Sequence, residues 1–192
     1  MTTDFSTTSS GGGTFTERAR RAQLVAVTIE LVADEGYGGA SLSRIAARAG
    51  ISKAAVLYHF STKDALVQAA YEHTLAALTD EVARAVEAAA PADRPAAYVR
   101  STIGHLREHP RHTRMLIEAM SHGVGEHQRS QRWQPLADLL QLAGVCPPAE
   151  ARNRAIIIGG AIDGIVAESL QDPGYDTAQA ADELVEVVLS GS

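Results

Sequence analysis

Hydrophobic positions recur at helical spacing along almost the whole chain. A first apolar stripe follows Thr14 and Glu17, which have the three-residue spacing of a capping box, and Gly36 offers a left-handed C-cap. Further stripes predict eight more helices, over residues 41–49, 52–60, 63–90, 96–109, 111–121, 135–143, 149–170 and 177–189. No segment keeps the two-residue period of a strand. The sequence therefore predicts an all-α protein of about nine helices.

The N-terminal residues have a different composition. Residues 1–13 are rich in Ser, Thr and Gly and lack the apolar core of a signal peptide, so they predict a disordered tail. No apolar run approaches the roughly 20 residues of a membrane-spanning helix. The single cysteine, Cys146, allows no disulfide within the chain. These features lead us to expect a cytoplasmic protein.

Charge is distributed unevenly along the chain, whose formal net charge is −6. Residues 14–63 carry seven Lys or Arg against four Asp or Glu, whereas residues 64–192 carry ten against eighteen. A basic N-terminal part joined to an acidic remainder favours contact between that basic part and phosphate groups.

The segment 41–60 has the pattern of a helix-turn-helix. Gly50 supplies the tight turn, Ile51 fills the angle between two short helices, and Val56 and Phe60 anchor the second helix inward. The positions left facing outward are Lys53, Ala54, Ala55, Leu57, Tyr58 and His59. Exposed Leu, Tyr and His side chains are unusual for a merely solvated helix, so the second helix is a candidate reader of the DNA major groove.

The residue types on this helix suit contacts with DNA. Lys53 can donate to guanine O6 and N7, and the methyl groups of Ala54 and Ala55 can meet thymine methyls. Ser41 can offer its hydroxyl and the free N–H groups of a helix N-terminus to phosphate. The candidates for contact with the flanking backbone are Tyr58, His59 and Lys63.

The stretches GYGGASLSRIAARAGISK (36–53) and LYHFSTKDAL (57–66) resemble the N-terminal domain of the tetracycline-repressor (TetR) family. The resemblance spans roughly residues 16–66. It implies a three-helix DNA-binding domain over 14–62, here called the head, and a helical ligand-binding and dimerisation domain over 63–192, here called the body. It also implies a homodimeric transcriptional repressor that a small-molecule ligand releases from a palindromic operator.

The resemblance also assigns roles by position. Ser43 joins Lys53, Ala54 and Ala55 where the family reads bases. The positions at which the family holds phosphate are Ser41, Tyr58, His59 and Lys63. The family's usual tyrosine one turn into the recognition helix is Leu57 here, which leaves open whether Tyr58 replaces that hydroxyl. The expected DNA-binding set is Ser41, Ser43, Ser52, Lys53, Ala54, Ala55, Leu57, Tyr58, His59 and Lys63.

The sequence evidence for a ligand site in the body is weaker than that for the DNA-binding residues. Met115, Met120 and Trp133 suit an apolar pocket, although core packing explains them equally well. Asp163 is a lone carboxylate in an apolar stretch, where it would bind a ligand, pair with an arginine across an interface, or face water.

Three histidines surround Pro110. His105 and His109 have the i, i+4 spacing that can share a metal, and His112 follows. Because Pro110 breaks the helix and no Cys or carboxylate completes an obvious tetrahedral set, we expect solvated or hydrogen-bonded histidines. The sequence thus predicts neither a metal nor a cofactor, and His105 remains a candidate ligand-binding residue.

Glycines in the most apolar helix suggest a subunit interface. Gly160 and Gly164 each cost about 1 kcal/mol relative to Ala, and close helix approach in a dimer would offset this. The resemblance places dimer contacts on the last two long helices, where Leu184 and Val188 are further candidates.

The sequence allows two alternatives to a ligand-responsive repressor. The body can serve only for dimerisation or protein docking while the head binds DNA. A helical enzyme is disfavoured, because no nucleophile–base pair, metal motif or phosphate loop is present in the sequence.

Overall fold

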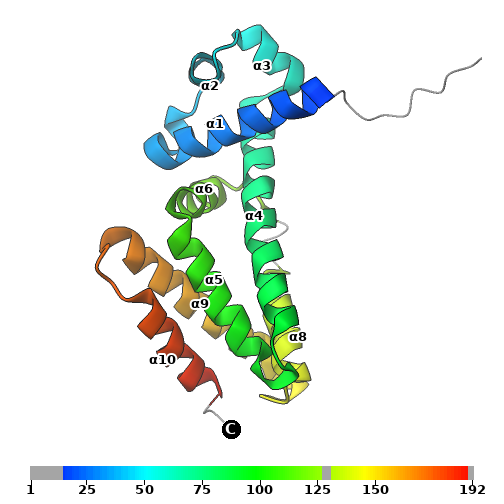
Figure 1. The fold of residues 1–192 in the computed structure, drawn as a ribbon, viewed down its shortest axis with the longest axis vertical. Helices are drawn as coiled ribbons and strands as arrows, with labels where there is room; N and C mark the ends of the chain where they lie inside the picture. The colour runs from blue at the N-terminus through cyan, green and yellow to red at the C-terminus, as the bar shows by residue number, and fades with distance from the viewer. Residues whose placement is uncertain (1–14, 127–130, 190–192) are drawn as a thin grey trace, which may run out of the picture.

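The computed structural model describes residues 15–126 and 131–189 (Figure 1). Within these ranges the chain forms nine α-helices, one short 3-10 helix and no strand. Their bounds are α1 (Phe15–Gly39), α2 (Leu42–Ala49), α3 (Lys53–His59), α4 (Lys63–Ala88), η1 (Pro91–Asp93), α5 (Arg94–Glu108), α6 (Pro110–Ser121), α8 (Gln134–Leu142), α9 (Pro148–Gln171) and α10 (Thr177–Leu189). The all-α class is confirmed. The expected tail, residues 1–13, and the capping residue Thr14 lie outside the described residues.

No described helix is both long enough and apolar enough to cross a membrane.

The first helix departs from its expected end. The sequence predicted a stop at Gly36, and Gly36 does leave the helical conformation, with φ 73° and ψ 171°. The chain resumes a helical turn after this kink and α1 reaches Gly39. A positive φ is accessible to glycine at little cost, so the kink is placed where the sequence permits it. It turns Tyr37 away from the axis of α1 and toward α4 and α6.

Side-chain caps start the next three helices. The hydroxyl of Ser41 accepts from the N–H of Arg44 at 3.2 Å. Ser52 caps α3 in the same way at 3.1 Å, and Thr62 caps α4 at 3.0 Å. Each such cap contributes about 1 kcal/mol, because it satisfies an N–H that the helix itself cannot.

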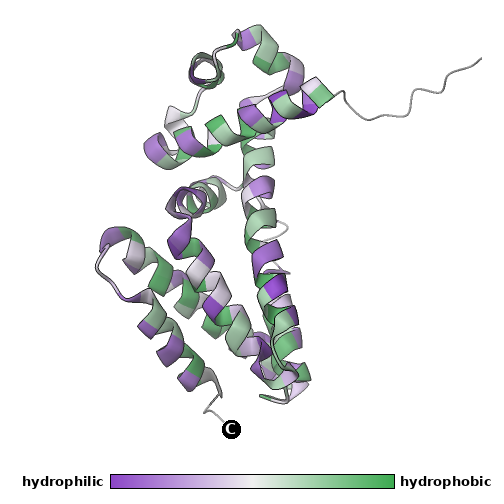
Figure 2. Ribbon diagram, viewed as in Figure 1, coloured by the Kyte–Doolittle hydropathy of each residue, from purple (hydrophilic) through white to green (hydrophobic). Residues whose placement is uncertain are grey.

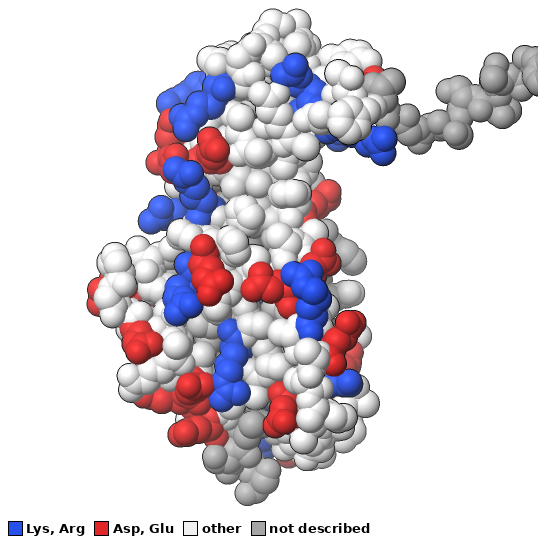
Figure 3. Space-filling view, viewed as in Figure 1, with Lys and Arg blue, Asp and Glu red and all other residues white. Residues whose placement is uncertain are grey.

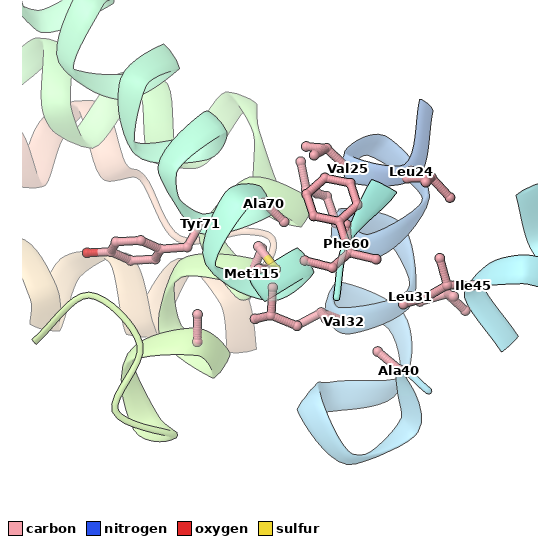
Figure 4. Close-up of a cluster of buried hydrophobic side chains, with 14 of the residues drawn as sticks. Leu24, Val25, Leu31, Val32, Ala40, Ile45, Phe60, Ala70, Tyr71 and Met115 are labelled. Atoms are coloured by element: carbon pink, nitrogen blue, oxygen red, sulfur yellow. The ribbon is translucent and has the colours of Figure 1, made fainter. Parts of the chain in front are cut away.

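A first hydrophobic cluster joins the head to part of the body. It contains buried side chains of α1 to α4 together with Met115, Leu116 and Ala119 of α6 (Figure 4). Figure 4 shows Met115 beside Val32 and Ala70. We call this the shared cluster, since α6 lies beyond the expected domain boundary at residue 62. That boundary itself stays a prediction.

A second hydrophobic cluster fills the rest of the body. It is formed by α5, α8, α9 and α10. Figure 1 shows α9 and α10 at the end of the molecule away from α2 and α3. In Figure 2, hydrophobic and hydrophilic residues alternate along α4, in keeping with a helix that is buried on one side.

Candidate DNA-binding interface

The turn between α2 and α3 has the geometry that the sequence predicted. Gly50 adopts a left-handed conformation with φ 68°, and its N–H donates to the carbonyl of Ala47 at 3.2 Å. The N–H of Ile51 donates to the carbonyl of Ala46 at 3.0 Å. Val56 is fully buried and Phe60 is nearly so, which fixes the inner side of α3 against the head.

The outer face of α3 is open to solvent. Lys53 and Ala54 are exposed, Leu57 is 43% exposed and Tyr58 is 75% exposed. Ala55 and His59 are half-buried, and the exposed serines of the expected set are Ser41, Ser43 and Ser52. No other described part of the chain therefore covers the surface on which the DNA-binding prediction depends. Figure 3 shows Lys and Arg side chains along this end of the molecule.

Helix α1 holds the two short helices in place. The guanidinium of Arg21 donates to the carbonyl of His59 and lies 4.1 Å from the centroid of the Phe60 ring. Gln23 donates from Nε2 to the carbonyl of Ala49 at 3.3 Å. These contacts orient the C-terminal ends of α2 and α3. Sequence reasoning missed Arg21, because nothing local relates it to residues 38 positions away.

Two of the expected phosphate contacts have partners within the chain. The hydroxyl of Tyr58 donates to Glu17 Oε1 at 3.3 Å. Lys63 donates to the carbonyl of Tyr37, and its Nζ lies 3.8 Å from the centre of that ring. Binding phosphate would exchange these contacts for new ones, and both roles stay predictions.

Tyr37 connects the head to two helices of the body, a connection that no local sequence pattern indicates. Its N–H donates to Glu118 Oε2 on α6 at 3.0 Å, and its ring stacks on that of His122 with centroids 4.3 Å apart. Its hydroxyl donates to Asp64 on α4. The hydrogen bond to the Asp64 carboxylate raises the pKa of Tyr37 to about 12, and burial and the negative charge add to the effect.

A Tyr37→Phe variant is expected to lose about 1 kcal/mol of stability at pH 8, because a hydrogen bond to a charged group is removed. The folded pKa lies above the unfolded value near 10, so this contribution is complete below pH 10 and is lost as pH rises through 12. Denaturant unfolding at several pH values checks it. If the difference in the free energy of unfolding between wild type and variant stayed constant up to pH 12, the Tyr37–Asp64 hydrogen bond would not be the cause of this stability.

The candidate ligand residues do not converge on one pocket. Met115 is fully buried in the shared cluster and Met120 packs against it, whereas Trp133 packs against the second cluster. Asp163 is exposed and pairs with Arg132, whose Nη2 lies 2.6 and 2.7 Å from its two oxygens. A cavity of about 270 Å³ lies instead between α5 and α10, lined by Arg100, Ile103, Gly104, Arg107, Thr177, Ala178, Ala181 and Asp182. The ligand role of the four residues stays a prediction.

His105 is buried at the junction of α4, α5 and α6. It is 3% exposed, and its Nδ1 lies 2.6 Å from Glu81 Oε2. The hydrogen bond from His105 is the main reason why the pKa of Glu81 falls below its usual value. Burial, followed by the neighbouring imidazoles, lowers the pKa of His112.

The candidate interface glycines lie on an open face of α9. Gly160 and Gly164 are exposed, and a Cβ added at either would have no neighbour within 4 Å. On the same helix Ile156 is 48% and Ile157 71% exposed. Leu184 is half-buried against the second cluster, and the side chain of Val188 lies outside the described part of the structure.

Comparisons with known proteins agree with this geometry. Residues 24–70 match the family described as bacterial regulatory proteins, tetR family. The HTH-type transcriptional regulator BetI 1 of Chromohalobacter salexigens is 31% identical over 172 residues, which cover 84% of each chain.

Two solved structures share the fold. A TetR-like transcriptional regulator from Rhodococcus sp. RHA1 superposes with a TM-score of 0.75 at 22% identity, covering 90% of this chain and 97% of that one. AibR, solved in complex with isovaleryl coenzyme A and operator DNA, superposes with a TM-score of 0.70 at 20% identity, covering 88% and 98%.

Proposed function

The chain belongs to the tetR family of bacterial regulatory proteins and is a DNA-binding transcriptional regulator, and we propose that it is a homodimeric repressor which a small-molecule ligand releases from a palindromic operator. The observation that carries the proposal is the open outer face of α3, held from behind by the buried Val56 and Phe60. A short helix fixed in this way can enter the major groove as a rigid element.

The residue types along α3 support the proposed contacts with DNA. Lys53 and the methyl groups of Ala54 and Ala55 lie in the first turn, where recognition helices meet base edges. Ser41 at the start of α2 and Tyr58 near the end of α3 flank them and would hold the backbone.

The exposed apolar face of α9 supports the homodimer. Ile157 projects into solvent in the isolated chain, and the two glycines beside it leave room for a second helix to approach closely. One recognition helix alone makes too few contacts for a specific operator, so two paired heads are also needed physically.

The connection between head and body supports release by a ligand. Helix α4 begins directly after the head and continues to Ala88 in the body, while α6 packs in the shared cluster. A molecule that favours one arrangement of these helices changes the head spacing and so the affinity for DNA. AibR was solved with both a coenzyme A ester and operator DNA, and by analogy the body of this chain would hold its effector.

Binding to DNA tests the outer face of α3. The probe is the duplex that the wild-type protein enriches from a random-sequence pool. Lys53→Ala is expected to weaken binding by about 5- to 150-fold, the range of one good base contact at 1–3 kcal/mol, and Tyr58→Ala to weaken it on all sequences.

Arg107→Ala, which removes an exposed cation from α5 in the body, is the matched control and should bind like wild type. Affinity and salt dependence that are unchanged in both α3 variants would reject this face as the DNA-binding surface.

A further inference from the structure

Four side chains of metal-binding type meet where α4, α5 and α6 converge. Glu81 lies on α4, His105 in the last turn of α5, His109 at the cap between α5 and α6, and His112 in the first turn of α6. One ligating atom from each of Glu81, His105 and His109 lies within 4.8 Å of the other two. The ring centroid of His112 is 5.5 Å from that of His109 and 6.5 Å from that of His105.

The three histidines lie close together even though the helix breaks at Pro110, as the sequence predicted. The N–H of His109 still donates to the carbonyl of His105 at 3.0 Å, so the i, i+4 relation extends to the helix cap. The two ring centroids are 4.4 Å apart. The carboxylate comes from Glu81, 24 residues before His105, and not from the sequence neighbour Glu108, which pairs with Arg107.

Two buried nitrogens of this group have no hydrogen-bond partner in the described structure. They are His105 Nε2 and His112 Nδ1. His105 Nδ1 is the ring nitrogen that faces the Glu81 carboxylate, and an ion bound between the two groups would replace the proton that Nδ1 now donates. A buried polar atom without a partner is costly, and an ion bound beside His112 would remove that cost for His112 Nδ1 by accepting its lone pair.

We propose that Glu81, His105 and His109 bind one divalent transition-metal ion of the zinc class, with His112 beside the remaining coordination position. Two imidazoles and a carboxylate suit Zn²⁺ and Co²⁺, whereas Mg²⁺ and Ca²⁺ prefer oxygen ligands throughout. Each donor would lie about 2 Å from the ion, so the three donor atoms, which lie within 4.8 Å of one another, would have to move closer together. His109 is exposed and Glu81 is 38% exposed, so the ion can enter from solvent.

The bound ion is also the ligand that releases the protein from its operator, and this part of the inference rests on the proposed function. Helix α6 carries His112 in its first turn, and nearer its end it carries Glu118, which accepts from Tyr37 of the head. Helix α4 carries Glu81 and begins directly after the head. An ion that holds α4, α5 and α6 together at this junction therefore favours one position of the head over others.

The visible absorption of bound Co²⁺, with Zn²⁺ displacing it, tests the site on the full-length protein. Wild type should bind one ion per chain, and His109→Ala should raise the dissociation constant by at least about tenfold, since even the loss of a supporting group costs that much. His109 is exposed, so this variant should fold even if His105→Ala does not. The control is His122→Ala, which removes an imidazole outside the group and should bind Co²⁺ like wild type.

The DNA arm uses the selected duplex with and without Zn²⁺. Zn²⁺ should weaken wild-type binding by about 5- to 150-fold and leave His109→Ala unaffected. No Co²⁺ signal in wild type, or an equal signal in His109→Ala, would overturn the metal site. Co²⁺ binding without any change in DNA affinity would overturn the effector role alone. Failure of the metal-free protein to enrich any duplex would instead reject the proposed function.

Discussion

An Ile157→Glu variant is expected to sediment as a monomer at concentrations where the wild-type protein is a dimer. Ile157 is 71% exposed and lies on α9 beside the open glycines, so in the proposed dimer it would be covered by the second copy. A glutamate there would bury an unpaired charge at about 3–5 kcal/mol, which raises the dimer dissociation constant by at least about 100-fold. Two-fold symmetry places the charge in both copies, so the effect acts twice.

Sedimentation equilibrium measures this shift, and operator affinity should fall with it because the heads are no longer paired. Leu142→Glu provides the matched control. Leu142 is 78% exposed at the C-terminal end of α8, outside the candidate interface helix α9, and the same substitution there should leave the dimer intact. Equal effects of the two substitutions, or none from Ile157→Glu, would place the interface elsewhere.

The second large effect is expected from Met115→Ala. Met115 is fully buried in the shared cluster, where it packs between α1 and α4 (Figure 4). Truncating a buried methionine leaves a cavity and costs about 2–5 kcal/mol. For a chain of this size each kcal/mol lowers Tm by about 2–4 °C, so the variant should melt well below wild type.

Thermal and denaturant unfolding give this difference directly. Ile117→Ala lies on the same helix but at a 44% exposed position, and it should lose less than Met115→Ala. Comparable losses of stability in the two variants would mean that both substitutions act on the helical conformation of α6, and that packing of Met115 in the shared cluster contributes little.

The sequence predicted those parts of the fold that depend on local chemistry. Ser41 and Ser52 cap the helices expected to follow them, and Gly50 takes the left-handed conformation that the turn requires. Glycine and capping serines act on residues within four positions, so a sequence pattern is enough to place them. The outer face of α3 follows from the same logic, since Val56 and Phe60 determine which side is inward.

Contacts across long sequence separations could not be found in this way. Arg21 reaches His59 38 positions later, and Tyr37 reaches Glu118 81 positions later. Charged and aromatic residues have many possible partners, and only the packing of α1 against α3 and against α6 selects among them. Glu81 shows the same limit, because its position opposite His105 depends on how α4 lies along α5.

The shared cluster limits how this protein can be recombined with its relatives. A chimaera that joins residues 15–62 to the body of a relative would lose the packing around Leu66 and Met115. Apolar surface of the head that is now fully buried would then be exposed to solvent. Swapped proteins of this kind should aggregate unless the donor segment also brings the start of α4 and a compatible α6. The segment that can be exchanged between relatives is therefore discontinuous: the DNA-binding head has to be transferred together with α6, which begins at Pro110.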